Sequence, residues 1–260
     1  MKEKILLCDG DSWTAGDIVD PEIFGEQLEH VNHPDNRPYR LPRVWPHKLG
    51  KLLGVDVENK SVAGSSNDAI VRRVVGDVID LLQTYQPNEI YVIIGWSSPE
   101  RKDFFFKGEW DGDFLKSWET LYPAQYSQNL PNKEVEKFYD TYLKYFWHEE
   151  EYLNRYINQN LYLHYFLKSK GIRHMFFDAF YQSKEVDMFH NHDLVDNLKK
   201  SETNIVDEFL NVRKQIFKDI SFRRFLMGDN DKLDKDLFQE FHPSEKAHSM
   251  WAKELYKDLK

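Results

Sequence analysis

The sequence has one cysteine, no long hydrophobic run and fewer basic than acidic residues. A single cysteine, Cys8, excludes a disulfide within the chain and any zinc site built from several cysteines. No stretch of about 18 consecutive apolar residues is present, so we expect no membrane span and no membrane partner. The first apolar run, residues 5–8, is too short for the core of a signal peptide, and we expect a soluble, cytoplasmic protein.

The shortage of positive charge argues against one class of partner, the nucleic acids. Lys and Arg number 35 against 44 Asp and Glu, which gives a formal net charge of −9 over 260 residues. Nucleic-acid binding needs clustered Lys and Arg to neutralise phosphates, so we expect no nucleic-acid partner. A chain of this length can bury a sizeable core without staples, and nothing in it reads as a flexible linker. We therefore expect a single domain over residues 1–260.

Apolar patterning predicts alternating strands and helices. Short apolar runs followed by Gly or polar turns are typical of buried parallel strands, and apolar residues at a 3.6-residue period are typical of helices. The order strand, helix, strand, helix, strand predicts an α/β fold with a parallel sheet. The expected strands are residues 5–8, 55–57, 89–95 and 172–177, and the expected helices are residues 44–53, 70–82, 134–170, 205–220 and 244–259.

The aromatic residues are concentrated in one segment. Residues 101–166 hold 19 of the 39 aromatic residues and depart from the strand–helix order, so we interpret them as an insertion after the strand at residues 89–95. Three interpretations stay open: the core of a helical subdomain, a lid or carbohydrate platform, and an interface for a protein partner, since aromatic residues are enriched at interfaces.

The ends of the predicted strands carry the candidate site. Ligands of open parallel α/β sheets bind at the carboxyl ends of the strands. Three such ends here are rich in Gly, Ser and Asn, and a fourth candidate begins the last helix. They are Asp9 to Gly16, Asn59 to Asp68, Gly95 to Arg101 and His242 to His248.

These segments resemble, in order, the motif blocks of the SGNH (GDSL-like) hydrolases. The matches are Gly10-Asp11-Ser12, then Gly64, then Gly95-Trp96-Ser97, then Gln239-Glu240-Phe241-His242. The resemblance implies a three-layer α/β/α sandwich with a flavodoxin-like parallel sheet of about five strands, and no metal or organic cofactor. The style of the motifs is also similar to versions encoded by tailed phages, for which a virion-associated location is the alternative to the cytoplasm.

The resemblance implies hydrolysis of a small acyl ester, with a carbohydrate O-acetyl ester as one substrate class. Ser12 would be the nucleophile of an acyl-serine mechanism and His242 its base, because a hydroxyl attacks poorly unless a base takes its proton. The oxyanion donors would be the backbone N–H groups of Ser12 and Gly64 with the Ser97 side chain, and Asn67 is an alternative to Ser97.

Two positions depart from the family pattern. Ser97 stands where the family has Asn, and Gln239 stands where the family has the Asp that orients the histidine. A neutral amide cannot stabilise an imidazolium as a carboxylate does, so Glu240 or Asp236 is the alternative orienting group. These departures keep a second hypothesis open, a weak or inactive SGNH-fold module that serves in binding or structure.

A third hypothesis is a Mg²⁺-dependent phosphatase. Asp9-Gly10-Asp11 resembles the Asp-x-Asp strand end of the haloacid-dehalogenase family, and Gly228-Asp229-Asn230-Asp231 resembles its late acidic motif. Trp13 stands where that family has Thr or Val, and the hypothesis leaves Gly64 and His242 without a role.

Four further features have plainer interpretations. His190-Asn191-His192-Asp193 lacks a matching ligand cluster and reads as a solvated loop rather than a metal site. We expect His248 to lie on a helix surface or in packing, and Arg101 to form a surface ion pair. Trp13 either lines a substrate pocket or packs in the core.

Overall fold

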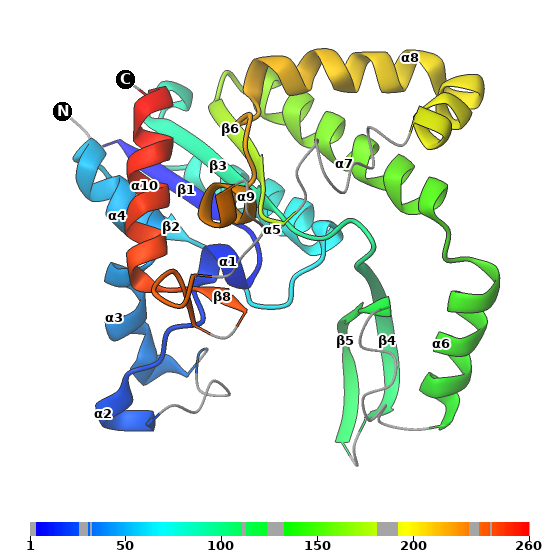
Figure 1. Cartoon of the computed structure of the whole chain (residues 1–260), viewed down its shortest axis with the longest axis horizontal. Helices are drawn as coiled ribbons and strands as arrows, with labels where there is room; N and C mark the ends of the chain where they lie inside the picture. Colours follow the sequence, from blue (N-terminus) through cyan, green and yellow to red (C-terminus); the bar gives the residue numbers. More distant parts are fainter. Residues whose placement is uncertain are drawn as a thin grey trace.

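The computed structural model describes residues 4–25, 31, 33–110, 113–123, 133–180, 192–228, 234–239 and 241–259. At its centre lies a four-stranded parallel sheet (Figure 1). The strand order is β2-β1-β3-β6, and the strands are β1 (Ile5–Asp9), β2 (Asp56–Asn59), β3 (Ile90–Trp96) and β6 (Arg173–Asp178). This sheet confirms the predicted α/β class.

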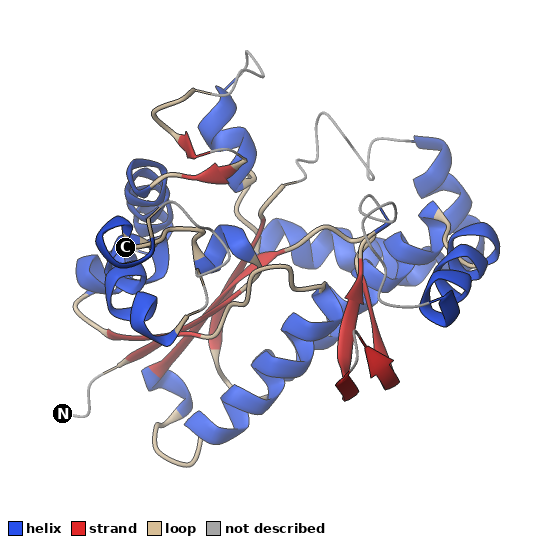
Figure 2. Ribbon diagram, turned by 90° about the horizontal axis from the view of Figure 1, so that it is seen from below, coloured by secondary structure: helices blue, strands red, loops and turns tan. Residues whose placement is uncertain are grey.

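Helices cover both faces of the sheet (Figure 2), as in a three-layer sandwich. Side chains alternate along β1, so that Ile5 and Leu7 join one buried cluster while Leu6 and Cys8 join the other. The first cluster includes helices α5 (Asn67–Leu81), α7 (Glu149–Ser169) and α8 (His192–Ile216). The second includes α4 (Trp45–Leu53), α9 (Phe222–Met227) and α10 (Glu245–Leu259). Among the described residues, none of the helices is both long and apolar enough to cross a membrane.

The expected fifth strand of the sheet is reduced to one bridge. Phe217 forms an isolated parallel bridge with Phe176 of β6, and the Lys218 N–H donates to the Phe176 carbonyl over 2.9 Å. Helix α8 runs to Ile216, and Ser221 already caps α9, so only the stretch between them is free to pair with the edge of the sheet. Before Phe176, the outer edge of β6 therefore has no strand beside it in the described chain.

Short elements connect these layers. Between β1 and α4 lie α1 (Ser12–Ala15), α2 (Pro21–Phe24), η2 (Pro34–Asn36), α3 (Arg37–Arg40) and η3 (Leu41–Arg43). The turn η4 (Pro87–Glu89) precedes β3, and the two-residue strands β7 (Phe238–Gln239) and β8 (His242–Pro243) pair antiparallel ahead of α10.

The aromatic segment begins with a hairpin that the sequence analysis did not predict. Strands β4 (Lys102–Trp110) and β5 (Asp113–Leu121) pair antiparallel and stand beside α6 (Lys133–Tyr145), away from the main sheet (Figure 1). The Phe104 ring centroid lies 4.9 Å from that of Phe138 and 5.2 Å from that of Tyr142, so aromatic contacts join the hairpin to α6. Periodicity missed the hairpin because its apolar residues cluster instead of alternating.

The expected single helix over residues 134–170 is wrong, because the chain forms α6 and α7 with a break between them. His148 is the N-cap of α7 and its Nδ1 accepts from the Glu150 N–H over 3.2 Å. Three consecutive glutamates follow in the first turn, where negative charge is favoured by the helix dipole. This acidic run was a helix-start signal inside a stretch that looked continuously helical.

A buried ion pair joins the end of β1 to α5. Asp9 is fully buried, and both of its carboxylate oxygens accept from Arg73, over 2.7 and 3.0 Å. Burial raises the pKa of Asp9 to about 7, although the charge and hydrogen bonds of Arg73 act to lower it. Removing the arginine would leave an uncompensated buried carboxylate.

We expect Arg73→Gln to lower the free energy of unfolding by about 3–5 kcal/mol near pH 8. The raised pKa means that the folded chain holds the Asp9 proton at a pH where the unfolded chain has lost it, so stability from this group falls as pH rises from about 4 towards 7. The loss in the variant should therefore be smaller near pH 5, where Asp9 is protonated in the folded state. Urea unfolding at both pH values measures it.

Arg43→Gln is the matched control. Arg43 lies 3.4 Å from Glu245 in a pair whose side chains are 32% and 49% exposed, and such pairs contribute at most about 1 kcal/mol. An Arg73→Gln loss no larger than that of Arg43→Gln would contradict the assignment.

Candidate active site

The structure brings Ser12 and His242 together from opposite ends of the chain. Ser12 lies three residues after the end of β1, and it begins α1 because the Asp11 carboxylate caps this helix by accepting from the Trp13 N–H over 3.0 Å. His242 lies in β8, ahead of α10. Its Nε2 is 3.1 Å from the Ser12 Oγ, which is hydrogen-bonding distance for a nucleophile and its base.

A carboxylate that the sequence analysis missed contacts the same imidazole nitrogen. Asp17 follows α1, and its Oδ2 lies 3.0 Å from the His242 Nε2. Burial lowers the pKa of Arg40 in α3, while the charge of Asp17 opposes this, so Asp17 also lies within the field of a buried arginine. No sequence motif indicates a role for Asp17. It lies in an irregular loop after α1, and the path of such a loop depends on tertiary packing.

The predicted orienting residues do not lie as expected. Gln239 is exposed, and its backbone pairs with that of His242 across the β7–β8 ladder. The Asp236 side chain is 74% exposed and forms an ion pair with Lys246. Glu240 lies outside the described residues. The carboxylate that contacts the His242 ring is instead that of Asp17, which follows α1 near the start of the chain.

One ring nitrogen facing two oxygens restricts the chemistry. If the Nε2 carries a proton, it donates to Asp17 and leaves no lone pair to take a proton from Ser12. If the Nε2 is unprotonated, it accepts from the Ser12 hydroxyl and the contact with Asp17 is unfavourable. In Ser-His-Asp triads the carboxylate holds the other ring nitrogen, so this arrangement differs from theirs.

Ser97 and Asn67 brace the loop after β3. The Ser97 hydroxyl lies 2.7 Å from the Asp11 Oδ2, to which it donates, and it accepts from the Arg101 Nη1 over 2.7 Å. The Asn67 side chain spans the Ser97 backbone, accepting from its N–H over 2.8 Å and donating to its carbonyl over 3.1 Å. The Ser97 and Asn67 side chains, which the sequence analysis proposed as oxyanion donors, thus form hydrogen bonds within the protein in this structure.

Arg101 pairs with a buried carboxylate, where the sequence analysis expected a surface ion pair. Its Nη1 lies 3.2 Å from the Asp11 Oδ2 and also donates to the Ser65 carbonyl. Burial raises the pKa of Asp11, and the positive charge of Arg101 acts in the opposite direction. The pair holds the strand end, the Gly64 loop and the start of the aromatic segment together.

Gly64 adopts a backbone conformation that favours glycine. Its φ of 81° lies in the left-handed region, where a side chain would be strained. The Tyr122 hydroxyl donates to the Gly64 carbonyl, and the Arg101 guanidinium lies 4.6 Å from the centre of the Tyr122 ring. Tyr122 follows β5, so the aromatic segment supplies a residue to the site. Sequence analysis missed it because one tyrosine does not stand out among so many aromatics.

Other candidates belong to the core. Trp13 is buried against Phe180, Phe222 and Phe238, so it packs and does not line an open pocket. His248 is also buried; its Nδ1 accepts from the Trp45 N–H, and burial lowers its pKa to about 3.

Asp9, which the phosphatase hypothesis would use, is taken up by an ion pair. Asp9 is buried and bonded to Arg73, which leaves no open face for a phosphoryl group. Residues 229–231 lie outside the described part of the chain, as do His190 and Asn191. Within the described residues, no group of three or more His, Cys, Asp or Glu side chains could hold a metal ion.

Comparison with known proteins gives the following. One similar solved structure is a lipolytic G-D-S-L protein from Desulfitobacterium hafniense, with 15% identity, a TM-score of 0.48 and 98% of each chain covered. A second is a lipolytic G-D-S-L protein from Veillonella parvula, with 12% identity, a TM-score of 0.47, and 97% of this chain and 96% of that chain covered. A third is the esterase EstA from Pseudoalteromonas sp., with 14% identity, a TM-score of 0.48, and 99% of this chain and 97% of that chain covered. No curated protein matches the sequence.

A family model matches most of the chain. It is described as a family of unknown function, DUF6071, and it covers residues 26–258, which include His242 but not Ser12. The chain therefore belongs to the DUF6071 family.

Proposed function

We propose that this protein hydrolyses small acyl esters, with Ser12 as the nucleophile and His242 as its base. The observation that carries the proposal is the 3.1 Å contact between the Ser12 Oγ and the His242 Nε2, made across a sequence separation of 230 residues. Its place at the carboxyl end of β1 adds support, because open α/β sheets bind ligands there.

The reaction would proceed in two halves. The Ser12 Oγ attacks the acyl carbonyl carbon while its proton passes to the His242 Nε2, and that proton then leaves with the alcohol as the ester bond breaks. Water then attacks the acyl carbon of the acyl-serine while its proton passes to the same nitrogen, and that proton returns to the Ser12 Oγ as the acyl–Oγ bond breaks and the acid leaves. The backbone N–H groups of Ser12 and Gly64 are the proposed oxyanion donors, since the Ser97 and Asn67 side chains already have partners.

The site favours a small acyl group. Ser12 is only 6% exposed and is followed by Trp13, which packs against Phe180, so a long acyl chain has little room beside the nucleophile. For the alcohol portion we infer a carbohydrate. Phe105 and Trp118 of the hairpin are about half exposed and meet edge to face with ring centroids 5.4 Å apart. The Arg72 guanidinium lies 4.3 Å over the Trp118 ring, so the exposed Phe105 ring is the better face for a sugar to stack on.

A second candidate function is a binding module without catalysis, with a glycan or a protein as its partner. Two observations favour it. The side chains of Ser97 and Asn67 are committed to bracing bonds, and Asp17 shares the imidazole nitrogen that the reaction needs. Losing one oxyanion donor lowers a rate by about 10²–10³, so both features together describe a slow enzyme or none.

An ester assay separates the two candidates. We expect the wild type to hydrolyse p-nitrophenyl acetate faster than the octanoate, and Ser12→Ala and His242→Ala each to lower kcat by at least about 10³. Ser249→Ala, which removes a hydroxyl from the exposed part of α10, is the matched control and should keep full activity. Turnover that survives Ser12→Ala, or no turnover of any acetyl ester, would refute the esterase.

Asp17 can be tested through the pH dependence of the same reaction. The carboxylate beside the Nε2 favours the protonated ring, which cannot act as a base, and Asp17→Asn removes that attraction. We expect the acid limb of the kcat/KM profile to move to lower pH in Asp17→Asn. Gln239→Asp should leave the profile unchanged, because residue 239 is exposed.

Two outcomes would contradict this assignment of Asp17. One is loss of activity at every pH in Asp17→Asn, which would make the carboxylate an essential partner of the ring. The other is a profile that moves with Gln239→Asp and not with Asp17→Asn, which would return the orienting role to the position that the family motif indicates.

A further inference from the structure

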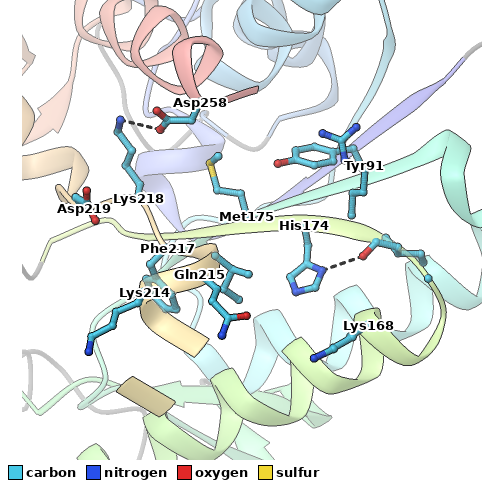
Figure 3. A pocket seen from close by; sticks show the side chains of 14 residues that line it. Tyr91, Lys168, His174, Met175, Lys214, Gln215, Phe217, Lys218, Asp219 and Asp258 are labelled. Atoms are coloured by element: carbon cyan, nitrogen blue, oxygen red, sulfur yellow. Dashed lines mark hydrogen bonds and ion pairs between the residues drawn. The ribbon is translucent and has the colours of Figure 1, made fainter. Parts of the chain in front are cut away.

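The two ends of the sheet differ in how their polar groups are arranged. A cavity of about 620 Å³ lies beside the start of β6, at the end of the sheet away from Ser12 (Figure 3). Figure 3 shows its exposed lysines, Lys168 and Lys214, at opposite ends of the cavity, so they do not meet on one ligand. At the Ser12 end, by contrast, the inserted aromatic segment makes direct contacts with the loop that holds Gly64.

The base of the β4–β5 hairpin contacts three consecutive residues of the loop before α5. The hydrogen-bonded pairs are Tyr122 with the Gly64 carbonyl, Arg101 with the Ser65 carbonyl and Asp103 with the Ser66 hydroxyl. Ser66 also caps α5, because its hydroxyl accepts from the Ala69 N–H over 3.1 Å. The loop is therefore held between the inserted hairpin on one side and a helix on the other.

Arg101 also brings this loop next to the proposed nucleophile. Its Nη1 lies 3.2 Å from the Ser65 carbonyl oxygen and 3.2 Å from the Asp11 Oδ2. Ser65 is the neighbour of Gly64 in the chain, and Asp11 is the neighbour of Ser12. One nitrogen atom thus joins the two segments that hold the proposed oxyanion donors. In the described part of the chain, the Gly64 N–H has no hydrogen-bond acceptor, so it is available to a ligand.

The Tyr122 hydroxyl restricts Gly64 in two ways. It donates to the Gly64 carbonyl and so orients the peptide plane that follows this residue. It also fills the space in which a side chain would stand, because a Cβ added to Gly64 would collide with the Tyr122 oxygen. The peptide planes on either side of Gly64 are related by its two dihedral angles, with φ at 81°. Holding the carbonyl therefore limits the directions that the Gly64 N–H can take.

The surroundings of Tyr122 keep its hydroxyl protonated, as a hydrogen-bond donor must be. Burial raises the pKa of Tyr122, and the positive charge of Arg101 acts to lower it. The negative charges of Asp11, Asp103 and Asp17 raise this pKa as well. The Arg101 guanidinium also lies 4.6 Å from the centre of the Tyr122 ring, so a cation–π contact helps to fix the ring.

We propose that Tyr122 is a positioning residue for ester hydrolysis, which holds the Gly64 N–H towards the oxyanion through its bond to the Gly64 carbonyl. The proposal rests on the proposed function, because it needs a reaction in which negative charge develops on the acyl oxygen. Tyr122 acts through Gly64 and takes no part in bond making. A well-held donor stabilises the transition state more than the bound ester, so the contact acts on kcat more than on KM.

Tyr122→Phe tests the proposal, since it removes the hydroxyl and keeps the ring against Arg101. With p-nitrophenyl acetate, we expect kcat to fall about tenfold while KM stays within about twofold. The expected loss is smaller than the 10²–10³-fold cost of a missing donor, because the Gly64 N–H is still present but less well held. Tyr145→Phe, which removes the hydroxyl of an exposed tyrosine of α6, is the matched control and should keep full activity.

A transition-state analogue separates positioning from a general loss of stability. The Ser12 Oγ adds to the boron of methylboronic acid and its proton passes to His242, which leaves a tetrahedral, negatively charged boron in place of the acyl carbon. We expect Tyr122→Phe to raise the inhibition constant of methylboronic acid by the factor by which it lowers kcat/KM. An inhibition constant does not depend on the fraction of enzyme that is folded, so the comparison holds for a less stable variant.

A double variant tests whether Tyr122 acts through Gly64. In Gly64→Ala the added Cβ already displaces the Tyr122 hydroxyl, so Gly64→Ala/Tyr122→Phe should have no lower kcat than Gly64→Ala alone. Fully additive losses would contradict the proposal.

Two further results would overturn the proposal and leave the esterase in place. One is a wild type whose turnover depends on Ser12 while Tyr122→Phe keeps full kcat. The other is a Tyr122→Phe variant that changes KM alone, which would make Tyr122 a binding residue. A wild type that turns over no acetyl ester would instead refute the esterase, and this proposal with it.

Discussion

Two buried carboxylates at the end of β1 hold the site region together. Asp9 and Asp11 are both inaccessible to water, and each meets an arginine from a different part of the chain, Arg73 of α5 and Arg101 after β3. A buried charge is tolerated only when it is paired and hydrogen-bonded, so the two arginines stabilise the carboxylates in these positions. These two ion pairs join the end of β1 to α5 and to the loop after β3, which lie at the same edge of the sheet.

The Asp11 pair also explains how the site residues are placed. One oxygen of Asp11 caps α1 and so presents Ser12, while the other accepts from Ser97 and Arg101. Arg101 in turn lies against Tyr122, whose hydroxyl reaches Gly64. The aromatic hairpin is thereby joined to the loop that holds Gly64. A single carboxylate links Ser12, the loop after β3 and the inserted segment.

The parts of this arrangement that follow from local sequence were predictable. Short apolar runs ending in glycine located β1 and β3, and a 3.6-residue period located α4, α5 and α10. The order of the motifs along the sequence was enough to pair Ser12 with His242. Asp17, Tyr122 and the role of Arg101 could not be predicted, because each depends on where a loop or a hairpin returns in space. The same holds for the β4–β5 hairpin and for the fifth strand, which is cut short by the length of α8.

Charge balance around Ser12 bears on whether the site can react. Asp9 faces Arg73, Asp11 faces Arg101, and Asp17 lies in the field of Arg40, so each carboxylate near the nucleophile has an arginine to oppose it. The charge of the His242 ring also acts to lower the pKa of Asp11, against the effect of burial. The developing oxyanion would then face a nearly neutral surrounding instead of three unopposed negative charges, which is the condition under which backbone N–H donors are effective. On the proposed mechanism, the contact between the Ser12 Oγ and the His242 Nε2 is the feature on which catalysis would depend.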